Sequence, residues 1–126
     1  MNYKTLSIIK ALVCLAFGPA LLIFPGFMMG LFGLEISPAA NMFARAYGAS
    51  LLGNMLLTYL SRSAEPSKLR KVICWDLFVY DLAGLIAIGI LQIQGLMNLL
   101  GWGIVIIYLF FSVGYGLFLL PQKSAA

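Results

Sequence analysis

Four long apolar segments account for most of this chain of 126 residues. They are residues 6–24, 39–60, 72–93 and 99–120. A helix that crosses the hydrocarbon core of a bilayer needs about 20 mostly apolar residues, and in lipid it must satisfy its backbone hydrogen bonds internally. The segments therefore predict an all-α membrane protein, a four-transmembrane-helix bundle that forms one domain over residues 1–126.

The composition supports this prediction. Hydrophobic residues make up 63% of the chain and charged residues 10%, whereas a soluble domain is roughly 45–50% apolar and about 25% charged. Too few charges remain to cover a water-facing surface. The net charge of +4 arises from residues beside the apolar segments, so it indicates a lipid bilayer with anionic headgroups as the partner, and no nucleic acid.

The distribution of basic residues predicts the orientation. Seven of the eight Lys and Arg residues fall on one side of such a bundle, at the start of the first span, in the connection between the second and third spans and after the fourth span: Lys4, Lys10, Arg62, Lys68, Arg70, Lys71 and Lys123. The connections on the other side contain a single acid, Glu35, and no base. By the positive-inside rule, we expect a multi-pass protein of the inner (plasma) membrane with both termini cytoplasmic.

The connection after the first span has an unusual composition. Residues 25–34 are rich in Phe, Met and Leu, which predicts an interfacial or re-entrant stretch. Ser37 and Pro38 then follow, and they are typical of a helix start, with Ser37 as the cap and Pro38 at the first helical position.

Several kinds of chemistry have no residues to support them. The chain has no histidine, and its two cysteines, Cys14 and Cys74, lack a CxxC spacing. We therefore predict no metal site and no cofactor, and we expect both cysteines to be buried apolar thiols. Ser and Thr residues within the spans have no base beside them, so an enzyme is the least favoured function.

Ionisable residues inside membrane spans usually face the bundle interior and mark important sites. Arg45 is expected roughly 9 Å from one end of the second span, and Asp81 roughly 15 Å from the opposite end of the third. These depths differ by about 6 Å, within reach of an Arg side chain. We therefore expect an Arg45–Asp81 pair, either as a pin that sets helix register or as a binding or proton site.

Two further charges are predicted nearer the cytoplasmic side. Asp76 and Lys10 have similar expected depths, so they either pair or both extend to the headgroups. Tyr80 lies one turn after Asp76 and could donate a hydrogen bond to it. Asp76 and Asp81 are separated by roughly 140° around the helix, which does not suit a catalytic carboxylate pair.

Other polar side chains occur within the spans, among them Asn41, Asn54 and Tyr108. Asn41 and Asn54 lie on opposite sides of the second span by helical spacing, so this helix is expected to pack on both sides or to face a cavity. Ala44-x-x-x-Gly48 in the same span is a small-xxx-small pattern that allows close helix approach. The functional alternative is a lipid- or quinone-sized groove lined by Tyr and Asn.

Residues 32–53 read FGLEISPAANMFARAYGASLLG. This stretch resembles the Phe-Gly … Ala-Arg-x-x-Gly-Ala-x-x-x-Gly pattern of small uncharacterised four-span bacterial inner-membrane proteins in the DoxX-like group. The resemblance implies a four-helix bundle with Arg45 and Gly48 as signature positions. It implies no particular activity.

Two functions are expected from these observations. The first is a non-enzymatic accessory or interaction subunit of a larger membrane assembly, because the chain is small, lacks a catalytic arrangement and has apolar, small-residue faces. Its partners would be other membrane subunits or further copies of itself. The alternative is a protein that binds or transports a lipid, quinone or ion at a buried Arg45–Asp81 site.

Overall fold

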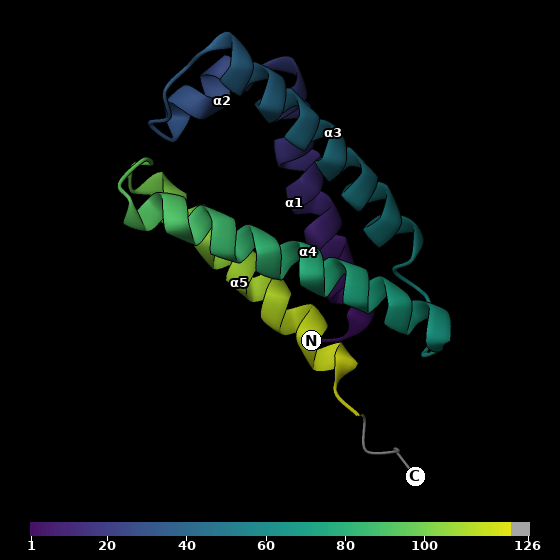
Figure 1. The fold of residues 1–126 in the computed structure, drawn as a ribbon. Coiled ribbons are helices and arrows are strands. Elements are labelled where there is room, and N and C mark those ends of the chain that lie inside the picture. Colours follow the sequence, from purple (N-terminus) through teal and green to yellow (C-terminus); the bar gives the residue numbers. More distant parts are fainter. Residues whose placement is uncertain (122–126) are drawn as a thin grey trace.

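A computed structural model describes residues 1–121, which form five helices and no strand (Figure 1). The helices are α1 (Tyr3–Ile23), α2 (Pro25–Leu31), α3 (Pro38–Leu60), α4 (Lys68–Ile93) and α5 (Leu100–Leu119). The all-α prediction is confirmed. Lys123, one of the bases that supported the predicted orientation, lies outside the described residues.

Three of these helices, α1, α4 and α5, are long and apolar enough to cross a membrane. α3 has 23 residues and therefore sufficient length, but it is more polar because Asn41, Arg45 and Asn54 interrupt its apolar sequence. The described residues thus contain three candidate spans, where the sequence predicts four.

The helix ends follow local capping chemistry. Pro38 is the first residue of α3, and the Ser37 hydroxyl accepts a hydrogen bond from the Ala40 amide at 3.1 Å, as predicted. α4 begins at Lys68 rather than at residue 72. The Ser67 hydroxyl accepts from the Arg70 amide at 3.2 Å and caps this polar first turn, which a hydropathy pattern does not detect.

The long helices pack as two pairs, α1 with α3 and α4 with α5 (Figure 1). A Cβ atom at Gly48 of α3 would lie 2.6 Å from the Gly18 carbonyl oxygen of α1, so glycine allows the two backbones to touch. In the other pair, the Tyr108 ring of α5 occupies the space that a Cβ atom at Gly84 of α4 would need. Such close approach matters in lipid, where helix association depends on van der Waals packing.

Residues 25–34, predicted to be interfacial or re-entrant, contain the seven-residue helix α2. Met28 and Met29 are buried, whereas Phe27 is exposed. α2 contacts both α1 and α3, so one side of this short helix belongs to the interior of the protein.

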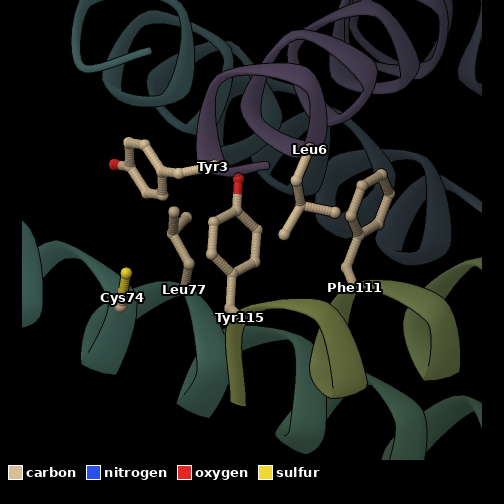
Figure 2. Packing of buried hydrophobic residues seen from close by; sticks show 6 residues of the cluster. All are labelled: Tyr3, Leu6, Cys74, Leu77, Phe111 and Tyr115. Carbon is tan, nitrogen blue, oxygen red and sulfur yellow. The ribbon is translucent and has the colours of Figure 1, made fainter. Parts of the chain in front are cut away.

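A side-chain cluster joins the two pairs at the end that holds the start of α1 and the end of α5, which we call the terminal end. Figure 2 shows its buried members, which come from α1, α4 and α5: Tyr3, Leu6, Cys74, Leu77, Phe111 and Tyr115. The Tyr3 ring meets the Tyr115 ring edge-on, with centroids 6.3 Å apart. The hydroxyls of Ser7 and Tyr115 are 3.2 Å apart and form a hydrogen bond. This cluster holds α1 against α4 and α5.

At the opposite end, which we call the far end, hydrogen bonds of one residue, Asn98, join the two helix pairs. The Asn98 amide donates to the Phe32 carbonyl oxygen at 2.9 Å, and Asn98 Nδ2 donates to the Leu31 carbonyl oxygen at 2.9 Å. Asn98 Oδ1 also accepts from the Leu100 amide at 3.0 Å, at the start of α5. The connection before α5 is thereby attached to the end of α2.

Candidate functional site

A cavity of about 390 Å³ lies between the two helix pairs. All five helices contribute to its wall, which is almost entirely apolar and includes Phe17, Met28, Phe43, Leu91 and Ile104. Its volume falls within the range of small-molecule sites, about 300–1,000 Å³. The space is partly open to the surroundings of the protein and far larger than a water molecule, so it is a candidate ligand site.

The wall of this cavity contains one buried ion pair. Lys10 Nζ of α1 donates to Asp81 Oδ1 of α4 at 2.5 Å, and the two side chains are 3% and 1% exposed. The Lys10 ammonium also lies 4.8 Å from the Phe111 ring centroid and 5.2 Å from that of Tyr80. Such rings stabilise a cation through their negative faces. The ion pair therefore links the two helix pairs just beyond the terminal-end cluster.

The ion pair leaves hydrogen-bonding capacity unused. Asp81 Oδ2 is buried and has no hydrogen-bond partner among the described residues. An ammonium group has three donors, and Lys10 uses one of them on Asp81 within the part of the chain that the structure describes. Because an unpaired buried polar atom is destabilising, these groups are suited to receive a polar group from a ligand.

Three tyrosines also contribute to the apolar wall. Tyr47 from α3, Tyr80 from α4 and Tyr108 from α5 all line the cavity. Tyr80 and Tyr108 were predicted as site residues, and the structure places both there. Tyr80 is the residue directly before Asp81 on α4, while the Tyr108 ring packs against Gly84.

The expected Arg45–Asp81 pair is wrong, because Asp81 pairs with Lys10 instead. Arg45 is exposed on α3, and α3 packs against α1 rather than α4. The depth estimate for the pair assumed that the second and third spans are neighbours. The packing instead places α3 against α1 and α4 against α5.

The suggested Lys10–Asp76 pair is wrong for a related reason. Asp76 is exposed and Asp81 is buried, as their separation of roughly 140° around α4 requires. With Asp81 turned toward α1, Asp76 must point away from it. Lys10 on α1 therefore pairs with Asp81 and not with Asp76.

The two asparagines are outside the cavity. Asn41 and Asn54 are half-buried on α3, and their Oδ1 atoms are buried without a hydrogen-bond partner among the described residues. Neither residue lines the cavity wall. Of the eight predicted site residues, the structure brings Lys10, Tyr80, Asp81 and Tyr108 together and leaves Arg45, Asn41, Asn54 and Asp76 apart.

Cys14 and Tyr47 are cavity residues that the sequence did not single out. Cys14 lies one turn after Lys10 on α1, so both residues share one side of the helix. Helical spacing could therefore have indicated that Cys14 belongs to the site. Both cysteines are buried and free, as predicted, but only Cys14 lines the cavity. Cys74 belongs to the terminal-end cluster.

Taken together, the residues form an apolar chamber with one polar end. Within residues 1–121, no group of three or more His, Cys, Asp or Glu side chains is placed to hold a metal ion. The polar end offers hydrogen-bond donors and an acceptor, and the rest offers apolar contacts. This arrangement is suited to holding an amphiphilic molecule.

No protein-family model, curated protein or solved structure matches this chain significantly. The resemblance of residues 32–53 to the DoxX-like group therefore stays a prediction.

Proposed function

We propose that this protein binds a lipophilic small molecule in the chamber between its two helix pairs. The observation that carries the proposal is the buried Lys10–Asp81 pair in the wall of an otherwise apolar cavity of about 390 Å³. An apolar wall without a partner forfeits van der Waals contacts. An apolar cavity stays dry and takes apolar guests, so a lipophilic ligand fits this wall better than water does.

The same proposal includes a membrane arrangement. All four long helices cross the inner membrane, and both termini face the cytoplasm. The length of α3 supports a fourth span, since 23 residues correspond to about 35 Å of helix. The bases Arg62, Lys68, Arg70 and Lys71 all lie at the terminal end, which the positive-inside rule assigns to the cytoplasm.

Labelling of single cysteines tests the arrangement of α3. Ile36→Cys and Ser63→Cys flank this helix, and each is introduced after Cys14 and Cys74 have been changed to Ala. We expect a membrane-impermeant maleimide to label residue 36 in intact cells and residue 63 only after the membrane is opened. Labelling of both from the same side would show that α3 does not cross.

Ligand binding is tested by extracting the tagged protein directly from its membrane into polymer nanodiscs. Mass spectrometry then measures the lipids and proteins that co-purify. Ala44→Phe places a ring in the chamber, since Ala44 lines it. Ala46→Phe is the matched control, because Ala46 is exposed on the same helix.

We expect one lipophilic molecule to be enriched over bulk membrane lipid with the unmodified protein and with Ala46→Phe. The same molecule should be lost with Ala44→Phe. If the unmodified protein carries no enriched molecule, the binding function is overturned. Equal enrichment with both Phe variants would place the ligand outside the chamber.

A role as an accessory subunit is the second candidate function. Arg45 supports it, because this side chain is exposed on α3 and forms no ion pair among residues 1–121. A charge on the lipid-facing side of a span is unfavourable unless it reaches the headgroups or a partner. The nanodisc experiment also tests this function, since a stoichiometric protein lost on Arg45→Gln but retained on Ala44→Phe would identify a partner at α3.

A further inference from the structure

We infer that the ligand of the chamber carries a neutral headgroup that both donates and accepts hydrogen bonds, as an alcohol does, and that this headgroup lies against Lys10 and Asp81. The inference rests on the proposed binding function and names the chemistry of its ligand. Three features of the chamber lead to it: its charge balance, its unused hydrogen-bonding atoms and the position of its polar end.

The charge balance disfavours an ionic ligand. Among residues 1–121, Lys10 and Asp81 are the only charged residues in the cavity wall, and together they are neutral. An anionic headgroup would draw Lys10 away and leave Asp81 as an unpaired buried charge, and a cationic headgroup would do the reverse to Lys10. An unpaired charge in a buried site is strongly unfavourable. A neutral headgroup leaves the pair intact.

The hydrogen-bonding atoms require both a donor and an acceptor. Asp81 Oδ2 is a buried acceptor without a partner among the described residues, and Lys10 Nζ has N–H groups beyond the one directed at Asp81. A hydroxyl group supplies one donor and two acceptor lone pairs, so it can serve both atoms. A ketone, quinone or ester supplies acceptors only and would leave Asp81 Oδ2 unsatisfied.

The two charged groups lie at one end of the chamber. On α1 the lining begins at Lys10 and continues to Leu21, which is about 16 Å along the helix axis. The lining of α2 includes Met28 and Met29, whose flexible side chains adapt to different shapes. A bound amphiphile would therefore place its headgroup at Lys10 and extend its apolar tail toward the far end.

The position of the ion pair along α4 agrees with a neutral headgroup. Asp81 lies about 20 Å from the start of α4 at Lys68, close to the middle of a helix about 39 Å long. A headgroup bound there would lie deep within the hydrocarbon layer of the proposed membrane arrangement. A phospholipid headgroup belongs at the membrane surface, whereas a neutral alcohol can enter the hydrocarbon at much lower cost.

Cys14 provides a reporter for the test. Its side chain lines the chamber one turn from Lys10, whereas Cys74 lies in the terminal-end cluster. The protein with Cys74→Ala is placed in phosphatidylcholine nanodiscs, and the rate at which N-ethylmaleimide labels Cys14 is measured. The probes are four molecules with the same tail: n-dodecanol, n-dodecane, dodecanoate and dodecylammonium.

We expect n-dodecanol to slow labelling at least tenfold more than each of the other three probes at equal membrane concentration. As a second measurement, deuterated dodecanol retained after gel filtration is counted by mass spectrometry, which does not depend on Cys14. The variant Lys10→Met/Asp81→Leu should retain dodecanol no better than dodecane. Asp76→Asn is the matched control, because Asp76 is exposed on α4, and it should keep the preference.

The outcomes separate the inference from the proposed function. Stronger protection and retention of dodecanoate or dodecylammonium, or equal effects of dodecane and dodecanol, would overturn the neutral hydroxyl headgroup while the binding function stands. If none of the four probes protects Cys14 or is retained, the binding function itself fails. Circular dichroism confirms that each variant is folded before it is compared.

Discussion

The two ends of the molecule hold the helix pairs together by different means. At the terminal end, side chains from three helices interlock, and Leu77 and Tyr115 are fully buried (Figure 2). At the far end, Asn98 joins the pairs through hydrogen bonds to the carbonyl oxygens of Leu31 and Phe32. Packing spreads stabilisation over many atoms, whereas a few hydrogen bonds concentrate it in one residue. We therefore expect the far end to open first and to admit ligands to the chamber.

The largest loss of stability is expected when the ion pair beside the terminal end is broken. Lys10→Met leaves Asp81 buried without its partner, and removal of one partner of a buried pair reduces stability by about 3–5 kcal/mol. Lys10→Met/Asp81→Leu should recover most of this loss, because it leaves no unpaired charge. The stability of both variants is measured by unfolding in mixed micelles with increasing sodium dodecyl sulfate. A double variant less stable than the single one would contradict the paired role of these residues.

Truncation in the terminal-end cluster should have the next largest effect. Tyr115→Ala removes a fully buried ring and leaves a cavity among three helices, so we expect the free energy of unfolding to fall by about 3 kcal/mol. Tyr115→Phe keeps the ring and loses only the hydrogen bond with Ser7. This change should lower the free energy of unfolding by about 0.6 kcal/mol. The same unfolding measurement compares them. Equal losses would mean that the hydrogen bond, and not packing, holds this end.

A change within one helix pair tests whether the pairs are rigid units. Gly48→Ala brings a Cβ atom to 2.6 Å from the Gly18 carbonyl oxygen, so α1 and α3 must separate, at a loss of about 1–3 kcal/mol. Gly53→Ala is the matched control on α3, because no atom lies within 4 Å of its added Cβ. It should raise stability by about 0.5–1 kcal/mol through helix propensity. Similar effects of the two changes would show that α1 and α3 are not in tight contact.

The smallest effect on global stability is expected at the far end. Asn98→Ala removes the hydrogen bond to Leu31 and the one that Asn98 Oδ1 accepts from Leu100, worth about 1–2 kcal/mol together. Hydrogen exchange should increase locally at residues 31–34 and 98–101, with little change near Tyr115. Gln94→Ala, at an exposed position of the same connection, is the control. A uniform increase along the chain would contradict a far end that opens independently.

The sequence predicted much of the helical structure. The helices α1, α3, α4 and α5 overlap the four apolar segments, because apolar length and capping residues such as Ser37 act locally along the chain. Its main error in helix position was the start of α4, where a polar first turn lies outside the apolar pattern.

The candidate site was predicted only in part. Lys10 and Asp81 were recognised as ionisable residues within spans, which is a property of composition and position. Their pairing was missed because it depends on how each helix is rotated and on which helices are neighbours. The cavity could not be foreseen for the same reason, since its wall combines residues from all five helices.

The sequence by itself determined an all-helical chain with long apolar helices, and it placed a base and an acid inside two of them. Only the tertiary structure decided that Asp81 turns toward Lys10 and that Arg45 stays exposed. Apolar length and helical period act within one segment. Helix pairing depends on close contacts between segments, such as that of Gly18 with Gly48, and those contacts exist only once the chain has folded.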